Sequence, residues 1–401
     1  MKKIRALLFC ICLFSTCLCY AQKRQLQTVR DQVKAGKELA KAEKTLRGLL
    51  VDSAARRNGR IWLMLCDVLA KQYEQGNEKL YLRQKYDTAA FFSVTRKLYD
   101  AMSSFDSLDA RPDGQGRIRP KYRIKHAAFL NSIRPNLFNG GGYFVHRGDY
   151  QTAFDYYSDY LRSASFPVLA GYDYMRKDAL IPHAAYWAMF CGYKLGDADK
   201  IMRFKELAER DTSMLNFVRQ YEAEAYLVKK DTAMYVKSLQ AGFEQYPNFA
   251  FFFPRLVEYY AGIGEHEKAL EITERALKAD STSLLFRFAK STALLNLGRY
   301  SECVRLCRQL ISEKDSFADA YYNIGLAYFN QAIELNKDRQ KYRANKEKVI
   351  SLYKLSRPYM ERYRELAPTA KEKWLAPLYT IYLNLNMGRE FDEIDKIRKE
   401  K

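Results

Sequence analysis

The stretch GIGEHEKALEITERALKADS, residues 262–281, decides the fold of this chain. After Gly264 its apolar residues recur every three or four positions, which is typical of an amphipathic helix. Gly264 stands just before that helix, where the chain must reverse and a residue that tolerates positive φ is favoured. Ala269 offers a small side chain, so a neighbouring helix can approach closely. The stretch therefore predicts the second helix of a helix–turn–helix unit.

The pattern recurs at an interval of 34 residues: Gly298 follows Gly264 at that distance, and Cys303 takes the place of Ala269. Upstream, HRGDYQTAFDYYSDYL (146–161) and KLGDADKIMRFKELAERD (194–211) repeat the order of glycine, apolar residue and helix. A fixed period of this length is the signature of helix pairs that stack and bury a shared core. The sequence therefore predicts an all-α fold, an α-solenoid of stacked antiparallel helix pairs.

The chain resembles the tetratricopeptide repeat (TPR) family in the stretches YYNIGLAYFNQA (321–332), GEHEKALEITERAL (264–277) and SRPYMERYRELAP (356–368). The resemblance implies a right-handed superhelix whose first helices line a concave, partner-binding face. Three other stretches resemble exported TPR proteins of Bacteroidetes-type bacteria in particular: LYLRQKYDTAAFF (80–92), SLDARPDGQGR (107–117) and RPNLFNGGGYF (134–144).

The repeats predict a solenoid over residues 131–401, after a less regular helical region, 22–130, with a degenerate first repeat and a basic loop at 108–126. Residues 369–401 are expected to cap the end of the stack. The last repeat is longer than the others because the charged stretch 334–348 either extends both of its helices or forms a protruding hairpin. Helix pairs are expected near residues 134–167, 182–215, 216–249, 250–283, 284–317 and 318–368.

Residues 1–21 have the three parts of a secretory signal peptide: a basic start, an apolar run over 6–19, and the small residue Ala21 at the cleavage site. Cys17 and Cys19 lie in poor contexts for lipidation, so cleavage after Ala21 is the favoured interpretation and a lipid anchor the alternative. The protein is therefore expected to be exported, and to be periplasmic, associated with the outer membrane or extracellular. No second apolar run is long enough to span a membrane.

Without the signal peptide the chain carries 64 Lys and Arg against 47 Asp and Glu, a net charge of +17. In an exported protein such a surplus favours anionic lipid headgroups or acidic polysaccharide as partners, and not nucleic acid. The alternative is a solvated basic surface without a dedicated partner.

No metal site, cofactor site or catalytic constellation is expected. Four cysteines remain after residue 21, and Cys303 and Cys307, one helical turn apart, are interpreted as buried apolar thiols. The glycines of NGGGYF (139–144) are explained by close helix packing and not by a phosphate loop. Glu222 and Glu224 are two positions apart, so on a helix they point to different sides. We therefore expect a protein that is not an enzyme.

Two kinds of partner site follow from these patterns. A protein or peptide partner is expected on the stripe of the first helices, at Arg255, Glu258, Phe288, Tyr322, Asn323, Leu326, Phe329 and Asn330. The aromatic members have an alternative role as core residues.

In the basic loop, cations alternate with Ile118, Pro120, Tyr122 and Ile124, so an extended segment would present one cationic edge and turn its apolar side inward. That edge, a hypothetical site for an anionic surface or else an ordinary loop, consists of Arg117, Arg119, Lys121, Arg123 and Lys125.

Overall fold

The computed structural model describes residues 23–337 and 342–399, and within these ranges the regular secondary structure is entirely helical. The expected all-α fold is confirmed. The expected signal peptide lies outside the described residues, as do residues 338–341 of the charged stretch. No helix in the described ranges is both long enough and apolar enough to cross a membrane.

The chain forms two compact units that divide between Asp231 and Thr232, within the expected pair 216–249. Residues 23–35 of the first unit are helical. The other helices of that unit are α2 (Leu39–Leu49), α3 (Ser53–Arg56), α4 (Gly59–Tyr81), α5 (Thr88–Asp109), α6 (Arg123–Ile133), α7 (Pro135–His146), α8 (Tyr150–Ser163), η1 (Pro167–Tyr172), α9 (Tyr174–Lys177), α10 (Ile181–Leu195), α11 (Ala198–Met202), α12 (Lys205–Ala208), η2 (Thr212–Met214) and α13 (Leu215–Val228).

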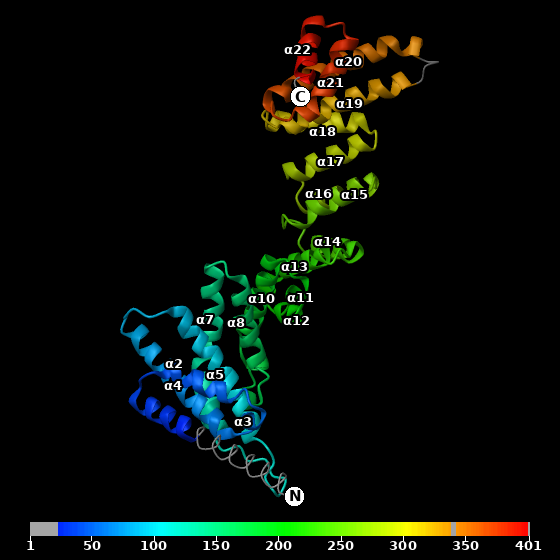
Figure 1. The fold of residues 1–401 in the computed structure, drawn as a ribbon. Helices are drawn as coiled ribbons and strands as arrows, with labels where there is room; N and C mark the ends of the chain where they lie inside the picture. Colours follow the sequence, from blue (N-terminus) through cyan, green and yellow to red (C-terminus); the bar gives the residue numbers. More distant parts are fainter. Residues whose placement is uncertain (1–22, 338–341, 400–401) are drawn as a thin grey trace, which may run out of the picture. The chain divides into compact units, whose positions relative to one another are not determined.

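The second unit is a regular stack in which each helix packs against the next along the chain (Figure 1). The charged stretch extends α19 and α20, the two longest helices of this unit. The helices of the unit are α14 (Thr232–Gln245), α15 (Phe252–Gly262), α16 (His266–Ala279), α17 (Leu284–Asn296), α18 (Tyr300–Glu313), α19 (Ala318–Lys337), α20 (Tyr342–Leu366), α21 (Lys371–Asn384) and α22 (Gly388–Lys399).

The turns between paired helices are made as the repeat pattern predicts. Gly264 and Gly298 adopt φ values of 76° and 71°, in the left-handed region that favours glycine. The N–H of Glu265, one residue after the first glycine, donates to the carbonyl of Tyr260 at 2.9 Å and so closes the end of α15. The backbone hydrogen bonds of the helix end thus continue into the reversal, and α16 can start at once.

Small residues allow the paired helices to approach each other. Ala269 and Cys303, at equivalent positions of α16 and α18, are 1% and 0% exposed. Gly325 on α19 serves the same purpose, since a Cβ there would lie 2.8 Å from Cγ of Met360 on α20. Gly325 leaves no room for a larger side chain, and the buried Ala269 and Cys303 occupy little space at the equivalent contacts.

An inserted segment, residues 164–180, separates α8 from α10 and interrupts the repeat spacing. It folds back onto Arg134, at the junction of α6 and α7, and the guanidinium lies between the rings of Tyr160 and Tyr174 at 3.8 and 3.9 Å. Asp178, at the end of the insertion, forms an ion pair with Arg134 and accepts a hydrogen bond from the Tyr160 hydroxyl at 2.7 Å. Arg134 is therefore one of several groups that hold the insertion, together with Val168 and Leu169, which are buried in the core of the first unit.

Candidate partner-binding surfaces

The stripe expected on the first helices of the second unit is half-buried, and its aromatic members contact other rings. The Tyr322 ring lies 4.9 Å from that of Tyr363, and the Phe288 ring 5.2 Å from that of Phe317. Phe329 lies 5.9 Å from Tyr353. The partly buried side chains of this stripe belong to Phe288, Tyr322, Leu326, Phe329 and Asn330.

Asn323 belongs to the core of the stack. Its side chain is 3% exposed, and its amide nitrogen donates to the hydroxyls of Ser291 and Thr292 on α17, both at 3.0 Å. Because a buried amide needs such partners, the side chain is committed to the α17–α19 contact. Its assignment to the partner-binding stripe is therefore wrong.

Arg255 and Glu258 lie on α15. The Arg255 guanidinium stacks over the Phe251 ring at 3.8 Å and donates to the Phe251 carbonyl at 3.2 Å, so it is held against its own helix. Glu258 is exposed.

A second set of half-buried aromatic side chains lies on α7, α10 and α13 of the first unit, where the sequence analysis placed no site. Along α10, His183, Trp187 and Phe190 are half-buried, and Trp187 Nε1 donates to His183 Nε2 at 3.0 Å. The Phe138 ring of α7 stacks on His183 at 6.0 Å. Phe217 of α13 lies 6.5 Å from the Tyr186 ring of α10. We define the aromatic surface as Phe138, His183, Trp187, Phe190 and Phe217.

The pattern that predicts this surface is present in IPHAAYWAMF (181–190), where three ring residues recur at intervals of four and three. Such a stripe by itself does not distinguish a buried core face from a half-exposed surface. At one edge of the surface, Phe138 also lines a cleft of about 400 Å³. The inserted segment supplies another wall of that cleft, through Tyr172, Tyr174 and Lys177.

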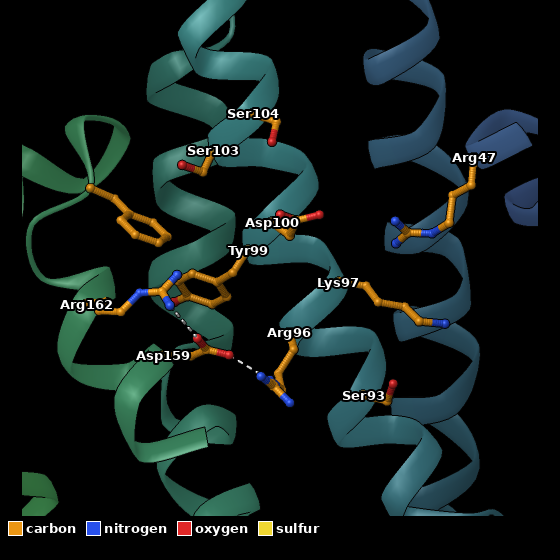
Figure 2. Close-up of a pocket in the computed structure, with 11 residues that line it drawn as sticks. Arg47, Ser93, Arg96, Lys97, Tyr99, Asp100, Ser103, Ser104, Asp159 and Arg162 are labelled. Carbon is orange, nitrogen blue, oxygen red and sulfur yellow. Dashed lines mark hydrogen bonds and ion pairs between the residues drawn. The ribbon is translucent and has the colours of Figure 1, made fainter. Parts of the chain in front are cut away.

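A second cleft of the first unit, of about 710 Å³, has one face of α5 as its floor (Figure 2). On one side of α5, Arg96 forms an ion pair with Asp159 of α8 at 2.6 Å. On the other side, Lys97 and Arg47 form ion pairs with Glu43 at 3.0 and 2.8 Å. Burial raises the pKa of Glu43, but its hydrogen bonds to Arg47, Lys97 and Gln72 outweigh this and lower it. The cations of this cleft are therefore largely matched by carboxylates.

The basic loop does not form the extended strand that the alternating pattern predicted. It ends at Tyr122, and α6 begins at Arg123, so Arg123 and Lys125 are helical. Arg123 is held by Asp106 of α5 through two hydrogen bonds of 2.7 and 2.8 Å. Ile118 and Ile124, expected to face inward, are 60% and 86% exposed. The expectation of a single cationic edge with the apolar residues turned inward is wrong, because Arg123 pairs with a carboxylate 17 positions away.

The thiols of Cys66, Cys191, Cys303 and Cys307 are all buried. Burial raises the pKa of the Cys66 thiol, and the hydrogen bond to Cys307 together with burial raises that of Cys303. A buried thiol with a raised pKa is a poor nucleophile, so Cys66 and Cys303 act as packing residues. Across residues 23–337 and 342–399, no group of three or more His, Cys, Asp or Glu side chains is arranged to hold a metal ion.

Neither a protein-family model nor a curated protein matches the chain. Similar solved structures include the C-terminal part of a TPR repeat-containing protein from Cytophaga hutchinsonii, with 13% identity over 65% of this chain and 93% of that one, at a TM-score of 0.45. A TPR protein from Bacteroides fragilis has 20% identity over 66% and 98% of the two chains, at a TM-score of 0.32. One from Parabacteroides merdae has 16% identity over 64% and 98%, at a TM-score of 0.38.

These similarities are too distant to support an argument about function. The repeat geometry is instead supported by features of the chain itself. The 34-residue interval, the left-handed glycine between paired helices and the small residue at each helix contact all recur in the second unit. The chain has a TPR-like all-α fold and resembles tetratricopeptide repeat proteins, those of Bacteroidetes among them.

Proposed function

We propose that the chain is a non-enzymatic scaffold that acts outside the cytoplasm and binds a protein partner on its first helices. The observation that carries the proposal is the aromatic surface of α7, α10 and α13. Aromatic side chains that keep one face accessible are enriched in protein interfaces, because each buries a large area and loses little conformational freedom on binding. Stacked helices present such a surface in the form that suits an extended or helical segment of a partner.

The cleft beside Phe138 adds a place for one side chain of the partner. Its walls combine rings with charged and amide groups, including Asn131, Asn139 and Lys177. Pockets of this composition bury an apolar group and orient it through a few polar contacts. We infer that the partner inserts an apolar or aromatic side chain there while the flanking residues cross the α10 rings.

The stripe of the second unit remains a proposed second contact. Without Asn323, it consists of Arg255, Glu258, Phe288, Tyr322, Leu326, Phe329 and Asn330. This stripe and the aromatic surface lie in different compact units, so they are proposed as two separate sites.

Replacing Trp187 and Phe217 together by serine is expected to weaken partner binding at least tenfold, since central aromatic side chains dominate the energy of such interfaces. Peptides selected from a displayed library on the mature protein, residues 22–401, serve as probes, and their dissociation constants are measured by calorimetry. The matched control replaces two exposed apolar residues of the second unit, Ile263 and Leu285, by serine. Equal affinities for the parent and the W187S/F217S variant, with both folded by circular dichroism, would reject the aromatic surface as the binding site.

Export is part of the proposal, and the mature protein is expected to begin at Gln22. The basic start, the apolar run and the small residue Ala21 support cleavage at this point. Intact mass measurement of the protein isolated from its own cells tests this expectation. A mass that includes the first 21 residues would contradict export. A mass that includes a diacylglyceryl group on Cys17 or Cys19 would show that the protein is anchored to a membrane rather than released.

A further inference from the structure

The loop before α6 exposes large apolar side chains among cations. Ile124, in the first turn of α6, is 86% exposed, Ile118 in the loop is 60% exposed and Tyr122 is 36% exposed. Single exposed apolar residues are common on protein surfaces, but two exposed isoleucines within seven residues of a highly charged segment are not explained by packing.

Cations outnumber carboxylates around these side chains. Arg117 pairs with Asp113 at 3.3 Å, and that carboxylate is shared with the backbone N–H groups of Gln115 and Arg117 in the turn. The Asp109 carboxylate accepts the N–H of Tyr122 at 2.8 Å. Lys125 acts on the Asp67 carboxylate through its charge. Three other exposed cations of the segment form no ion pair with a carboxylate in the described part of the chain: Arg111, Arg119 and Lys121.

The neighbouring turn before α4 adds to this charge. The Phe105 ring of α5 lies 5.3 Å from that of Tyr122, and it also adjoins Gly59, where a Cβ would lie 3.7 Å from it. Next to that glycine, Arg57 and Arg60 are exposed and take part in no ion pair with a described acidic residue. The two segments, each with exposed cations, therefore approach the same end of α5.

The segment is held in place at several points, so the exposure of its isoleucines is a property of an ordered surface. Arg123 is fixed by two hydrogen bonds to Asp106, whose side chain is 4% exposed. The Tyr122 ring stacks on His126 at 5.9 Å in addition to its contact with Phe105. A preorganised surface loses little conformational entropy when it binds.

We propose that residues 111–125 dock the protein on an anionic lipid membrane, with Ile118 and Ile124 inserted into the headgroup boundary and the cations on the lipid phosphates. Interfacial binding combines apolar insertion with attraction to anionic lipid, and this segment offers both. A soluble acidic polymer needs the cations alone and leaves both isoleucines in water. The membrane is therefore the partner that uses the whole surface. This site is separate from the protein-binding surface proposed above.

The test measures co-sedimentation of the mature protein with phosphatidylcholine vesicles that contain 30% phosphatidylglycerol or none. The parent is expected to bind the anionic vesicles at low salt and to be released at about 0.5 M salt. Salt screens exposed charges over a distance of ~10 Å at 0.1 M, and this distance shortens as the salt concentration rises. No binding to anionic vesicles at low salt would overturn the proposal.

Two variants separate the apolar and the electrostatic contributions. I118S/I124S is expected to bind anionic vesicles about tenfold more weakly and to bind soluble dextran sulfate as the parent does. R119S/K121S is expected to lose affinity for both, by about fivefold per cation on the vesicles. Both variants spare Arg117 and Arg123, which hold the loop, and I263S/L285S is again the matched control.

Equal vesicle binding by I118S/I124S and the parent would overturn the proposal and leave a purely electrostatic surface. An equal loss by I118S/I124S on vesicles and on dextran sulfate would overturn it too, since insertion cannot affect a soluble polymer. Peptide binding through Trp187 and Phe217 is measured without vesicles, so its outcome is independent of this one.

Discussion

Replacing Arg134 by methionine is expected to lower the free energy of unfolding of the first unit by about 3–5 kcal/mol, because the Asp178 carboxylate, whose side chain is only 13% exposed, then lacks its cation. The arginine is 4% exposed and lies between two tyrosine rings. It also donates to the Ser163 hydroxyl and the Tyr160 carbonyl, both at 3.2 Å. Urea unfolding of the mature protein measures the loss, and hydrogen exchange of residues 164–180 shows whether the insertion has detached.

A double variant identifies the buried charge as the cause. R134M/D178N has no orphaned carboxylate, so it is expected to be more stable than R134M although it lacks the same contacts. If R134M and R134M/D178N are equally destabilised, the loss is due to packing and hydrogen bonds alone, and the argument from the buried charge fails.

The same ion pair predicts a pH dependence. Burial raises the pKa of Asp178, but hydrogen bonds from Tyr160 and Arg134 outweigh burial and hold that pKa below its ordinary value of 3.8. A carboxyl group whose pKa is lowered on folding stabilises the protein above its unfolded pKa, and this contribution is lost as the pH falls through the folded pKa. The stability difference between the parent and D178N is therefore expected to be constant above about pH 5 and to shrink below pH 4.

Replacing Gly192 by alanine is expected to lower the free energy of unfolding by about 3 kcal/mol or more. This value is at the upper end of the losses caused by overpacking a core. A Cβ at this position of α10 would lie 2.6 Å from the backbone nitrogen of Ile201 and 2.9 Å from the carbonyl carbon of Lys200. Because these are backbone atoms of α11, no side-chain rotation relieves the clash, and α11 must move. Thermal and urea unfolding measure the loss.

Gly48 of α2 provides the matched control for this substitution. It is an exposed helical glycine with open space around its Cβ position. Alanine there is expected to raise stability by about 0.5–1 kcal/mol, since glycine is a poor helix former. If G192A is as stable as the parent while G48A shows its gain, α10 and α11 do not approach as closely as the structure has them.

The sequence predicted the regular part of this protein well. Helix periodicity, the glycine turn and the small residue at the helix contact are local or nearest-neighbour properties, and a 34-residue interval repeats them with the same consequence each time. Gly264, Ala269 and Cys303 could therefore be given their structural roles before any coordinates. The aromatic surface of α10 was visible in IPHAAYWAMF as a helical stripe, but its partial exposure was not.

What the tertiary structure decided lies in contacts between residues far apart in the chain. Asn323 belongs to the stripe by periodicity. Its amide is nevertheless buried, because it donates hydrogen bonds to Ser291 and Thr292 of another helix. Arg123 belongs to the basic alternation, yet it pairs with Asp106 of another helix. Ile124 is exposed because it lies in the first turn of the helix that begins at Arg123. A pattern of residue types states which side chains can pair or be buried, whereas the distant partner that satisfies a particular amide or guanidinium is known only once the chain has folded.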